Sequence, residues 1–301
     1  MKKRVLLTGA TGFIGRQAIE SLLAKGYEVH AVSKMALETL PDSVHKHQCD
    51  LIDHSQTTAL MQQIAPTHLL HFAWYAIPGK YWTSSANLDW VRASLHLVQQ
   101  FASAGGKRMM LAGTCAEYDW SSGLCVEGAT PLTPLTLYGS CKAGLYRIVE
   151  SFAKQNGLSS AWGRIFFLYG PHEYPERLVP SVIRSLLKNE TAKCSHGTQI
   201  RDFMHVADVA DAFVTLLDSD LQGSINIASG EPLPLKTVIE KIAHKCGKTG
   251  QVQYGPLTTS PNDPPLISAD VSRLQNELRW RPRYSLDQGL EETINWWKKH
   301  L

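Results

Sequence analysis

The sequence lacks any hydrophobic run close to the about 18 residues that a membrane-spanning helix needs, which argues against a membrane protein. It also lacks a strong charge of one sign. Its 30 basic and 27 acidic residues give a formal net charge of +3, too small to predict a nucleic-acid partner. Only the apolar residues 5–7 separate the basic amino terminus from Thr8, fewer than a secretory signal requires. We therefore expect a cytoplasmic protein that binds neither membranes nor nucleic acids.

Paired cysteines are absent too. The six cysteines are scattered and form no Cys-x-x-Cys motif, so free thiols in a reducing compartment are expected. His45, His47 and Cys49 alternate and would share one face of a strand. Because nothing nearby in the sequence supplies a fourth ligand, we expect no metal site.

What the sequence does contain is a glycine-rich turn near its start. Apolar residues 5–7 precede Gly9, Gly12 and Gly15, and a helical stripe of apolar residues follows until Gly26. A strand that passes through glycines into a helix presents the first backbone N–H groups of that helix to an anionic pyrophosphate. A second apolar run completes the order strand, helix, strand. This pattern predicts a dinucleotide-binding site.

A Tyr-x-x-x-Lys pair lies in the middle of the chain, at Tyr138 and Lys142. Of the ten tyrosines, only Tyr138 is followed four residues later by a lysine. Residues four apart share a helical face, so the ammonium group can reach both the phenol and a cofactor ribose. Together with an oxidised nicotinamide, this cation is predicted to lower the pKa of Tyr138 from about 10 toward neutrality, which suits proton exchange during hydride transfer.

The glycine spacing, the Tyr138–Lys142 pair and Thr114 after the predicted strand 108–113 resemble one known family. It is the extended branch of the short-chain dehydrogenase/reductase superfamily, the NAD-dependent epimerase/dehydratase family that acts on nucleotide sugars. The resemblance covers nearly the whole chain and implies that Thr114, Tyr138 and Lys142 are catalytic. The cofactor-binding positions it implies are Gly9, Thr11, Gly12, Phe13, Ile14, Gly15, Ser33, Lys34, Asp50, Leu51, Phe72, Ala73, Tyr138 and Lys142.

The same resemblance predicts an α/β fold in two lobes. We expect a Rossmann-type, doubly wound parallel sheet in an NAD(P)-binding domain at 1–170, to which 198–228 returns. A smaller α/β substrate lobe is expected from 171–197 and 229–301. Dimers that form through a helix pair are common in the family, so a homodimer is an assembly that the resemblance allows.

The residues after the second predicted strand bear on the choice of cofactor. An NAD site usually has Asp or Glu about 20 residues beyond the glycines, where it binds the ribose 2′-hydroxyl. Here Ser33 and Lys34 occupy that position, and a hydroxyl with a cation suits a 2′-phosphate. We therefore expect NADP(H), with NAD(H) as the alternative if Lys34 is a solvated surface lysine.

The predicted substrate site combines aromatic and basic side chains. An aromatic loop at 74–82 follows a predicted buried strand, and its rings could either stack on a sugar or base or anchor the loop. By resemblance, Arg201 binds the nucleotide diphosphate, and Asp202 holds local structure by pairing with an arginine. Phe167 stands where the family has an asparagine that touches the diphosphate. The candidate substrate-binding residues are Trp74, Tyr81, Thr114, Arg177 and Arg201.

Cys115 and Ala116 distinguish this chain within the family. Sugar 4,6-dehydratases have Asp and Glu at these positions, because elimination of water needs an acid and a base at neighbouring carbons. We therefore expect NADP(H)-dependent reduction of a nucleotide-linked 4-keto-6-deoxy sugar, with Tyr138 as general acid. A nucleotide-sugar 4-epimerase with tightly bound NAD is the alternative among enzymes. A non-catalytic dinucleotide-binding regulator is the alternative outside them.

Overall fold

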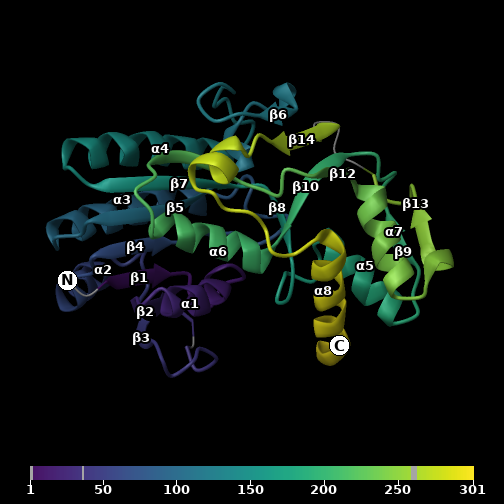
Figure 1. The fold of residues 1–301 in the computed structure, drawn as a ribbon, viewed down its shortest axis with the longest axis horizontal. Coiled ribbons are helices and arrows are strands. Elements are labelled where there is room, and N and C mark those ends of the chain that lie inside the picture. The colour runs from purple at the N-terminus through teal and green to yellow at the C-terminus, as the bar shows by residue number, and fades with distance from the viewer. Residues whose placement is uncertain (1–2, 36, 259–262) are drawn as a thin grey trace.

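The computed structural model describes residues 3–35, 37–258 and 263–301 (Figure 1). The strands are β1 (Arg4–Thr8), β2 (Glu28–Ser33), β3 (His45–Gln48), β4 (His68–His71), β5 (Arg108–Thr114), β6 (Leu124–Cys125), β7 (Ser159–Ile165), β8 (Phe167–Tyr169), β9 (Ala192–Cys194), β10 (Ile200–His205), β11 (Gly223–Ile227), β12 (Pro232–Pro234), β13 (Val252–Tyr254) and β14 (Leu266–Ala269). The helices are α1 (Gly15–Ala24), α2 (His54–Ile64), α3 (Ala86–Ser103), α4 (Leu137–Gln155), α5 (Leu178–Leu187), α6 (Val206–Leu217), α7 (Leu235–Lys245) and α8 (Leu286–His300).

The larger lobe is built on a seven-stranded sheet with the order β11-β7-β5-β4-β1-β2-β3. All neighbouring strands in it run parallel. The chain moves outward from β1 to β3 and then crosses back to β4, so the strand order reverses between β1 and β4. In open α/β sheets, ligands bind in the crevice at the carboxyl ends of the strands at such a point. The predicted Rossmann-type fold is confirmed.

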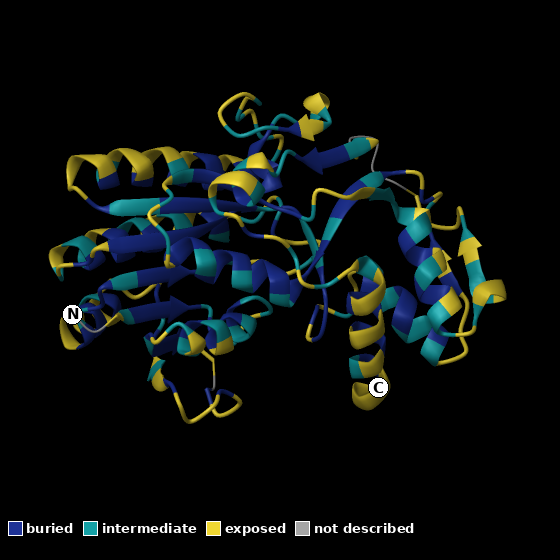
Figure 2. Cartoon of the chain, viewed as in Figure 1, coloured by how far each residue is buried: buried dark blue, intermediate teal, exposed yellow. Residues whose placement is uncertain are grey.

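Both faces of this sheet are covered by helices, as the buried strands in Figure 2 show. Successive residues of a strand point to opposite faces. In β1, Leu7 packs in a core that includes Ile19 of α1 and Phe213 of α6. Its neighbour Leu6 packs in a second core with Met61 of α2 and Leu97 of α3. The near-continuous apolar runs of the sequence follow from this burial on both faces.

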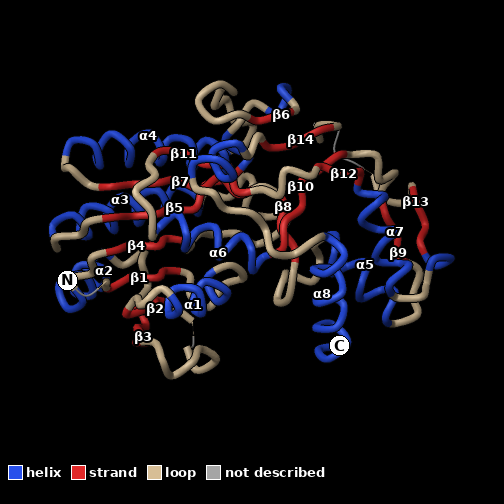
Figure 3. The backbone as a smooth tube through the Cα atoms, viewed as in Figure 1, coloured by secondary structure: helices blue, strands red, loops and turns tan. Residues whose placement is uncertain are grey.

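The smaller lobe contains a mixed sheet in the order β12-β10-β14-β6, with β8 paired to β10, and a two-stranded sheet of β13 and β9 (Figure 3). Helices α5, α7 and α8 share a core that includes Ile183, Ile239 and Ile294. Within 198–228, α6 and β11 belong to the large lobe, whereas β10 lies in the second sheet. In the described ranges, no helix is long and apolar enough to cross a membrane.

Candidate active site

The glycine-rich turn connects β1 to α1 at the point where the strand order reverses. Gly9 has a φ of +68°, and a Cβ atom built on it would lie 2.9 Å from the Ala73 nitrogen just beyond β4. A Cβ atom on Gly15 would collide with the Gly9 carbonyl oxygen. The turn therefore requires glycine at both places, and no side chain caps the amino terminus of α1 by a hydrogen bond. This cradle fits the pyrophosphate of a dinucleotide.

Arg16 is a charged residue at this turn that the sequence analysis missed. Its Nη2 donates a hydrogen bond to the Thr11 carbonyl oxygen at 2.6 Å, and its Nη1 lies 2.8 Å from Nδ1 of His172. The guanidinium group thus adds positive charge beside the glycines. Its position directly after Gly15 could have indicated from the sequence that a positive charge lies at the turn.

The predicted ribose-binding residues lie together at the ends of β2 and β3. The Ser33 hydroxyl is 2.8 Å from the Thr11 hydroxyl and accepts a hydrogen bond from the Met35 nitrogen. Lys34, whose side chain is 71% exposed, forms an ion pair with Asp50 at 2.7 Å. The Asp50 carboxylate therefore lies beside Lys34, the cation on which the prediction of an NADP(H) 2′-phosphate was based.

The other predicted cofactor residues line the same region. Ala73 donates its backbone N–H to the Thr8 hydroxyl at 3.4 Å. The Phe72 ring packs edge-on against Phe213, with 4.9 Å between centroids. Leu51 is buried in the core beneath α2. Phe13 and Ile14 are half-buried within the turn itself.

The first turn of α4 brings Tyr138 to Thr114. The Thr136 hydroxyl caps the helix by accepting a hydrogen bond from the Gly139 nitrogen at 3.1 Å. A side chain on Gly139 would collide with the Ala116 carbonyl oxygen, so glycine lets α4 approach the turn after β5. This approach brings the phenol of Tyr138 next to the Thr114 side chain.

Three aromatic rings of the 74–82 loop surround the phenol ring of Tyr138. The ring centroids of Tyr81, Trp82 and Trp74 lie 4.8, 5.8 and 6.5 Å from that of Tyr138, all nearly edge-on. Burial raises the pKa of Tyr138, and the neighbouring Thr114 side chain only partly opposes this. The predicted lowering of the Tyr138 pKa also requires an oxidised nicotinamide beside the phenol, and it stays a prediction.

Lys142 is buried one helical turn beyond Tyr138. Its Nζ donates a hydrogen bond to the Ala112 carbonyl oxygen at 2.8 Å and lies 3.7 Å from the centre of the Trp74 ring. Burial lowers the pKa of Lys142 to about 7, against the opposing effect of Glu117. The ammonium group is thus held by β5 and by the aromatic loop.

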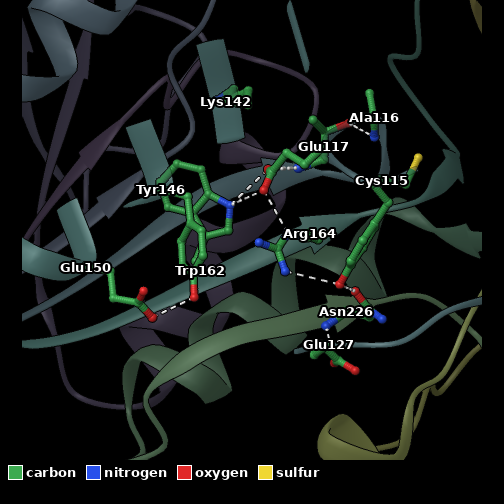
Figure 4. A network of polar contacts seen from close by, with 12 residues as sticks. Cys115, Ala116, Glu117, Glu127, Lys142, Tyr146, Glu150, Trp162, Arg164 and Asn226 are labelled. Atoms are coloured by element: carbon green, nitrogen blue, oxygen red, sulfur yellow. Dashed lines mark hydrogen bonds and ion pairs between the residues drawn. The ribbon is translucent and has the colours of Figure 1, made fainter. Parts of the chain in front are cut away.

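A buried polar network around Glu117 and Arg164 is joined to the backbone of Thr114 (Figure 4). The Glu117 carboxylate accepts hydrogen bonds from the Thr114 backbone nitrogen at 2.8 Å and from Nε1 of Trp162 at 2.9 Å. It also pairs with Nε of Arg164 at 2.7 Å. Arg164 in turn donates to the Tyr118 hydroxyl at 3.1 Å. The sequence analysis assigned Glu117 no role, although the Thr114-x-x-Glu117 spacing of a capping box was a local signal; its other partners, Trp162 and Arg164, lie on β7, remote in the chain.

Trp74 and Tyr81, two of the predicted substrate residues, belong to the aromatic loop, and Asn87 holds both in place. Asn87 is buried and accepts a hydrogen bond from Nε1 of Trp74 at 2.9 Å, while it donates to the Tyr81 carbonyl oxygen at 2.7 Å. It thereby fixes the loop. Arg177, at the start of α5, donates from Nη2 to the Tyr81 hydroxyl at 3.5 Å. Tyr81 thus contacts Arg177 through its hydroxyl and Tyr138 through its ring.

Arg201, the fifth predicted substrate residue, is buried and already paired. Its Nη2 lies 2.6 Å from the Asp263 carboxylate, and its guanidinium group stands 5.4 Å from the centre of the Phe167 ring. Phe167 therefore supports the arginine. The predicted pairing of Asp202 with an arginine is wrong, since its carboxylate accepts hydrogen bonds from the backbone nitrogens of Ser229 and Gly230.

A doubly wound parallel sheet with a glycine-rich turn at its reversal point defines a Rossmann-type dinucleotide-binding protein. The model of the NAD dependent epimerase/dehydratase family matches residues 5–228, and the chain belongs to that family. The UDP-glucuronate 4-epimerase of Thermodesulfobacterium geofontis is 26% identical, over 98% of this chain and 96% of the relative. The family lies in the extended branch of short-chain dehydrogenases/reductases, which agrees with the predicted resemblance.

Solved structures give the same result. The Thermus thermophilus UDP-glucose 4-epimerase in complex with NAD superposes with a TM-score of 0.86 at 26% identity, over 99% of this chain and all of that one. MoeE5 in complex with UDP-glucuronic acid and NAD superposes with a TM-score of 0.85 at 29% identity, over 99% and 100%. Both are similar to this chain along its whole length.

Proposed function

We propose that this chain reduces a nucleotide-linked 4-keto-6-deoxy sugar with NADPH, and that Thr114, Tyr138 and Lys142 carry the reaction. One observation supports this most strongly. The first turn of α4 packs against the turn after β5, so the Tyr138 phenol stands next to Thr114, and Cys115 and Ala116 beside them have no acid or base to offer. This arrangement serves proton transfer to a single oxygen atom.

Tyr138 acts as the general acid. A bound reduced nicotinamide supplies the hydride that reaches C4 of the sugar. Because burial keeps the pKa of Tyr138 high, the phenol is protonated at neutral pH and can give its proton to the C4 oxygen. Thr114 donates a hydrogen bond to the same oxygen and stabilises the charge that develops there. Lys142, held against β5, positions the ribose and balances the phenolate that forms.

Dehydration is disfavoured by the residues after Thr114. The Cys115 thiol is buried, and burial raises its pKa far above neutrality, so it neither takes nor gives a proton at working pH. Ala116 has no titratable group. The acid and base that elimination of water needs are therefore missing at both positions.

Arg177 and Arg201 are the proposed ligands of the substrate diphosphate. Guanidinium groups bind phosphate oxygens in pairs of hydrogen bonds. Arg201 stands over the ring of Phe167, which packs against the core that contains Cys115, and Arg177 reaches the aromatic loop through Tyr81. A diphosphate would compete with Asp263 for Arg201.

A nucleotide-sugar 4-epimerase that retains NAD is the second candidate. The observation that favours it is the Lys34–Asp50 ion pair, because the carboxylate offsets the charge that a 2′-phosphate would need. Similar structures that contain NAD, among them the epimerase from Thermus thermophilus, also support this alternative. Both candidates use the same three catalytic residues.

The identity of the nucleotide released from purified, denatured protein distinguishes the reductase from the epimerase. Release of NAD, with no preference for NADPH when the empty protein is refilled, would overturn the reductase proposal. An empty site that binds NADPH more tightly than NADH supports it. Lys34→Ala should then weaken NADPH binding about tenfold and leave NADH binding unchanged, as loss of one phosphate contact predicts.

A further inference from the structure

Four polar side chains gather on one face of β2 and β3, at the end of the sheet away from the glycine-rich turn. Glu28 and His30 are two residues apart on β2, and His45 and His47 are two apart on β3. The parallel register sets His30 directly opposite His45. Side chains two apart point to the same face of a strand, so the register brings both pairs together. Cys49 is not part of this cluster, because it lies beyond β3 and is buried in a core.

The distances suit a single metal ion. Nε2 of His30 and Nε2 of His45 lie 3.1 and 3.6 Å from Oε1 of Glu28. The ligand atoms of the three residues all lie within 4.8 Å of one another. A tetrahedral ion with bonds of about 2.1 Å holds its ligand atoms roughly 3.4 Å apart, which is close to the two distances from Glu28.

His47 contacts the second ring nitrogen of His30. Its Nε2 lies 2.9 Å from Nδ1 of His30, and the two rings are stacked at 5.1 Å. Nε2 of His30 hydrogen-bonds the Glu28 carboxylate at 3.1 Å, and because a carboxylate only accepts, Nε2 carries the proton in the metal-free protein. An ion bound at Nε2 would displace this proton and require the tautomer with its proton on Nδ1, which can donate a hydrogen bond to Nε2 of His47.

We propose that Glu28, His30 and His45 bind one divalent transition-metal ion of the zinc type, with His47 as the supporting partner of His30. Two imidazoles and a carboxylate suit Zn²⁺ or Ni²⁺ and do not suit Mg²⁺ or Ca²⁺. The His45 side chain is 60% exposed, which leaves room for water as the fourth ligand. The ion would fasten β3, the edge strand of the large sheet, to β2. This site is independent of the proposed reaction.

The test is calorimetric titration of full-length protein without a polyhistidine tag, first stripped with a chelator, against ZnCl₂ and separately against MgCl₂. We expect one Zn²⁺ per chain with a dissociation constant on the order of 1 μM, a higher melting temperature with Zn²⁺, and no binding of Mg²⁺. His45→Ala and Glu28→Gln should each weaken Zn²⁺ binding at least tenfold. His244→Ala, which removes an exposed histidine of α7, should leave it unchanged.

His45 is exposed, so its replacement should leave the far-ultraviolet circular dichroism spectrum unchanged. X-ray absorption of the Zn²⁺ complex should show two imidazoles in the coordination shell. The proposal is overturned if wild-type protein binds no Zn²⁺, or if His45→Ala binds it as tightly as the wild type, since the ion would then be adventitious or held elsewhere.

Discussion

The Glu117 carboxylate lies 2.7 Å from Nε of Arg164, and both side chains are almost fully buried beneath Thr114. Because Glu117 also accepts the Thr114 backbone N–H, this pair connects the stability of the fold to the position of a proposed catalytic residue. Glu117→Gln keeps an acceptor for Thr114 but leaves the Arg164 charge uncompensated. We expect the free energy of unfolding to fall by roughly 3–5 kcal/mol in urea denaturation.

The double variant Glu117→Gln/Arg164→Met provides the control for that experiment. Removal of both charges should recover much of the lost stability, since a buried charge without a partner costs more than an apolar side chain. If the unfolding free energy of the single variant lies within about 1 kcal/mol of the wild type, the ion pair contributes no more than a weak surface pair does. That result would contradict its proposed role in stability.

Tyr138→Phe tests the proposed general acid. Because the phenol oxygen is the proton source, we expect kcat to fall about 10²- to 10⁴-fold. Turnover is followed through nicotinamide absorbance with a 4-keto sugar nucleotide. Tyr146→Phe is the matched control on the same helix, since it loses only a hydrogen bond to Glu150 at the surface. Equal activity of the two variants would rule out Tyr138 as the acid.

The parts of the site that depend on spacing within one stretch could be predicted from the sequence. The glycine-rich turn is one, because sterics at Gly9 and Gly15 determine it locally, and the Tyr138–Lys142 pair on one helical face is another. The contacts of Arg201 could not be predicted, since its partner Asp263 is 62 residues away. The direction of the Tyr138 pKa shift could not be predicted either, because it depends on how tightly the rings of the 74–82 loop enclose the phenol.

The same limit applies to the cluster on β2 and β3. His45 and His47 were recognised as neighbours on one face, but Glu28, the carboxylate partner of His45, lies on another strand. Only the register that pairs His30 with His45 brings Glu28 within reach. A pattern along one strand says nothing of the residues beside it, and the expectation of no metal site was based on that single strand.

Gly15→Ala tests the steric basis of the dinucleotide site. The added methyl group would collide with the Gly9 carbonyl oxygen and displace the turn from α1. Dinucleotide affinity, measured by fluorescence titration, should fall at least tenfold, which corresponds to about 1.4 kcal/mol. Gly144→Ala is the control: it is an exposed glycine within α4, and among the described residues no atom outside its chain neighbours and the adjoining helix backbone lies within 4 Å of an added Cβ. That variant should bind normally and gain up to about 1 kcal/mol of stability. Equal binding by both alanine variants would refute the steric account.

Glu173, in the segment between β8 and α5, should make stability depend on pH. Burial raises the pKa of its carboxyl group to about 8 in spite of nearby Arg177, and its Oε2 has no hydrogen-bond partner among the described residues. Below pH 4.5 the group is protonated in both the folded and the unfolded chain. Between pH 4.5 and 8 only the unfolded chain ionises, so stability falls as the pH rises, and above pH 8 the loss is complete.

Glu173→Gln cannot ionise, so its free energy of unfolding should match the wild type near pH 4 and exceed it at pH 9 by on the order of 4 kcal/mol. Urea denaturation at pH 4, 7 and 9 measures the difference, with Glu176→Gln as the exposed control. A difference that does not change with pH would mean that Glu173 is already ionised at neutral pH and paired with Arg177.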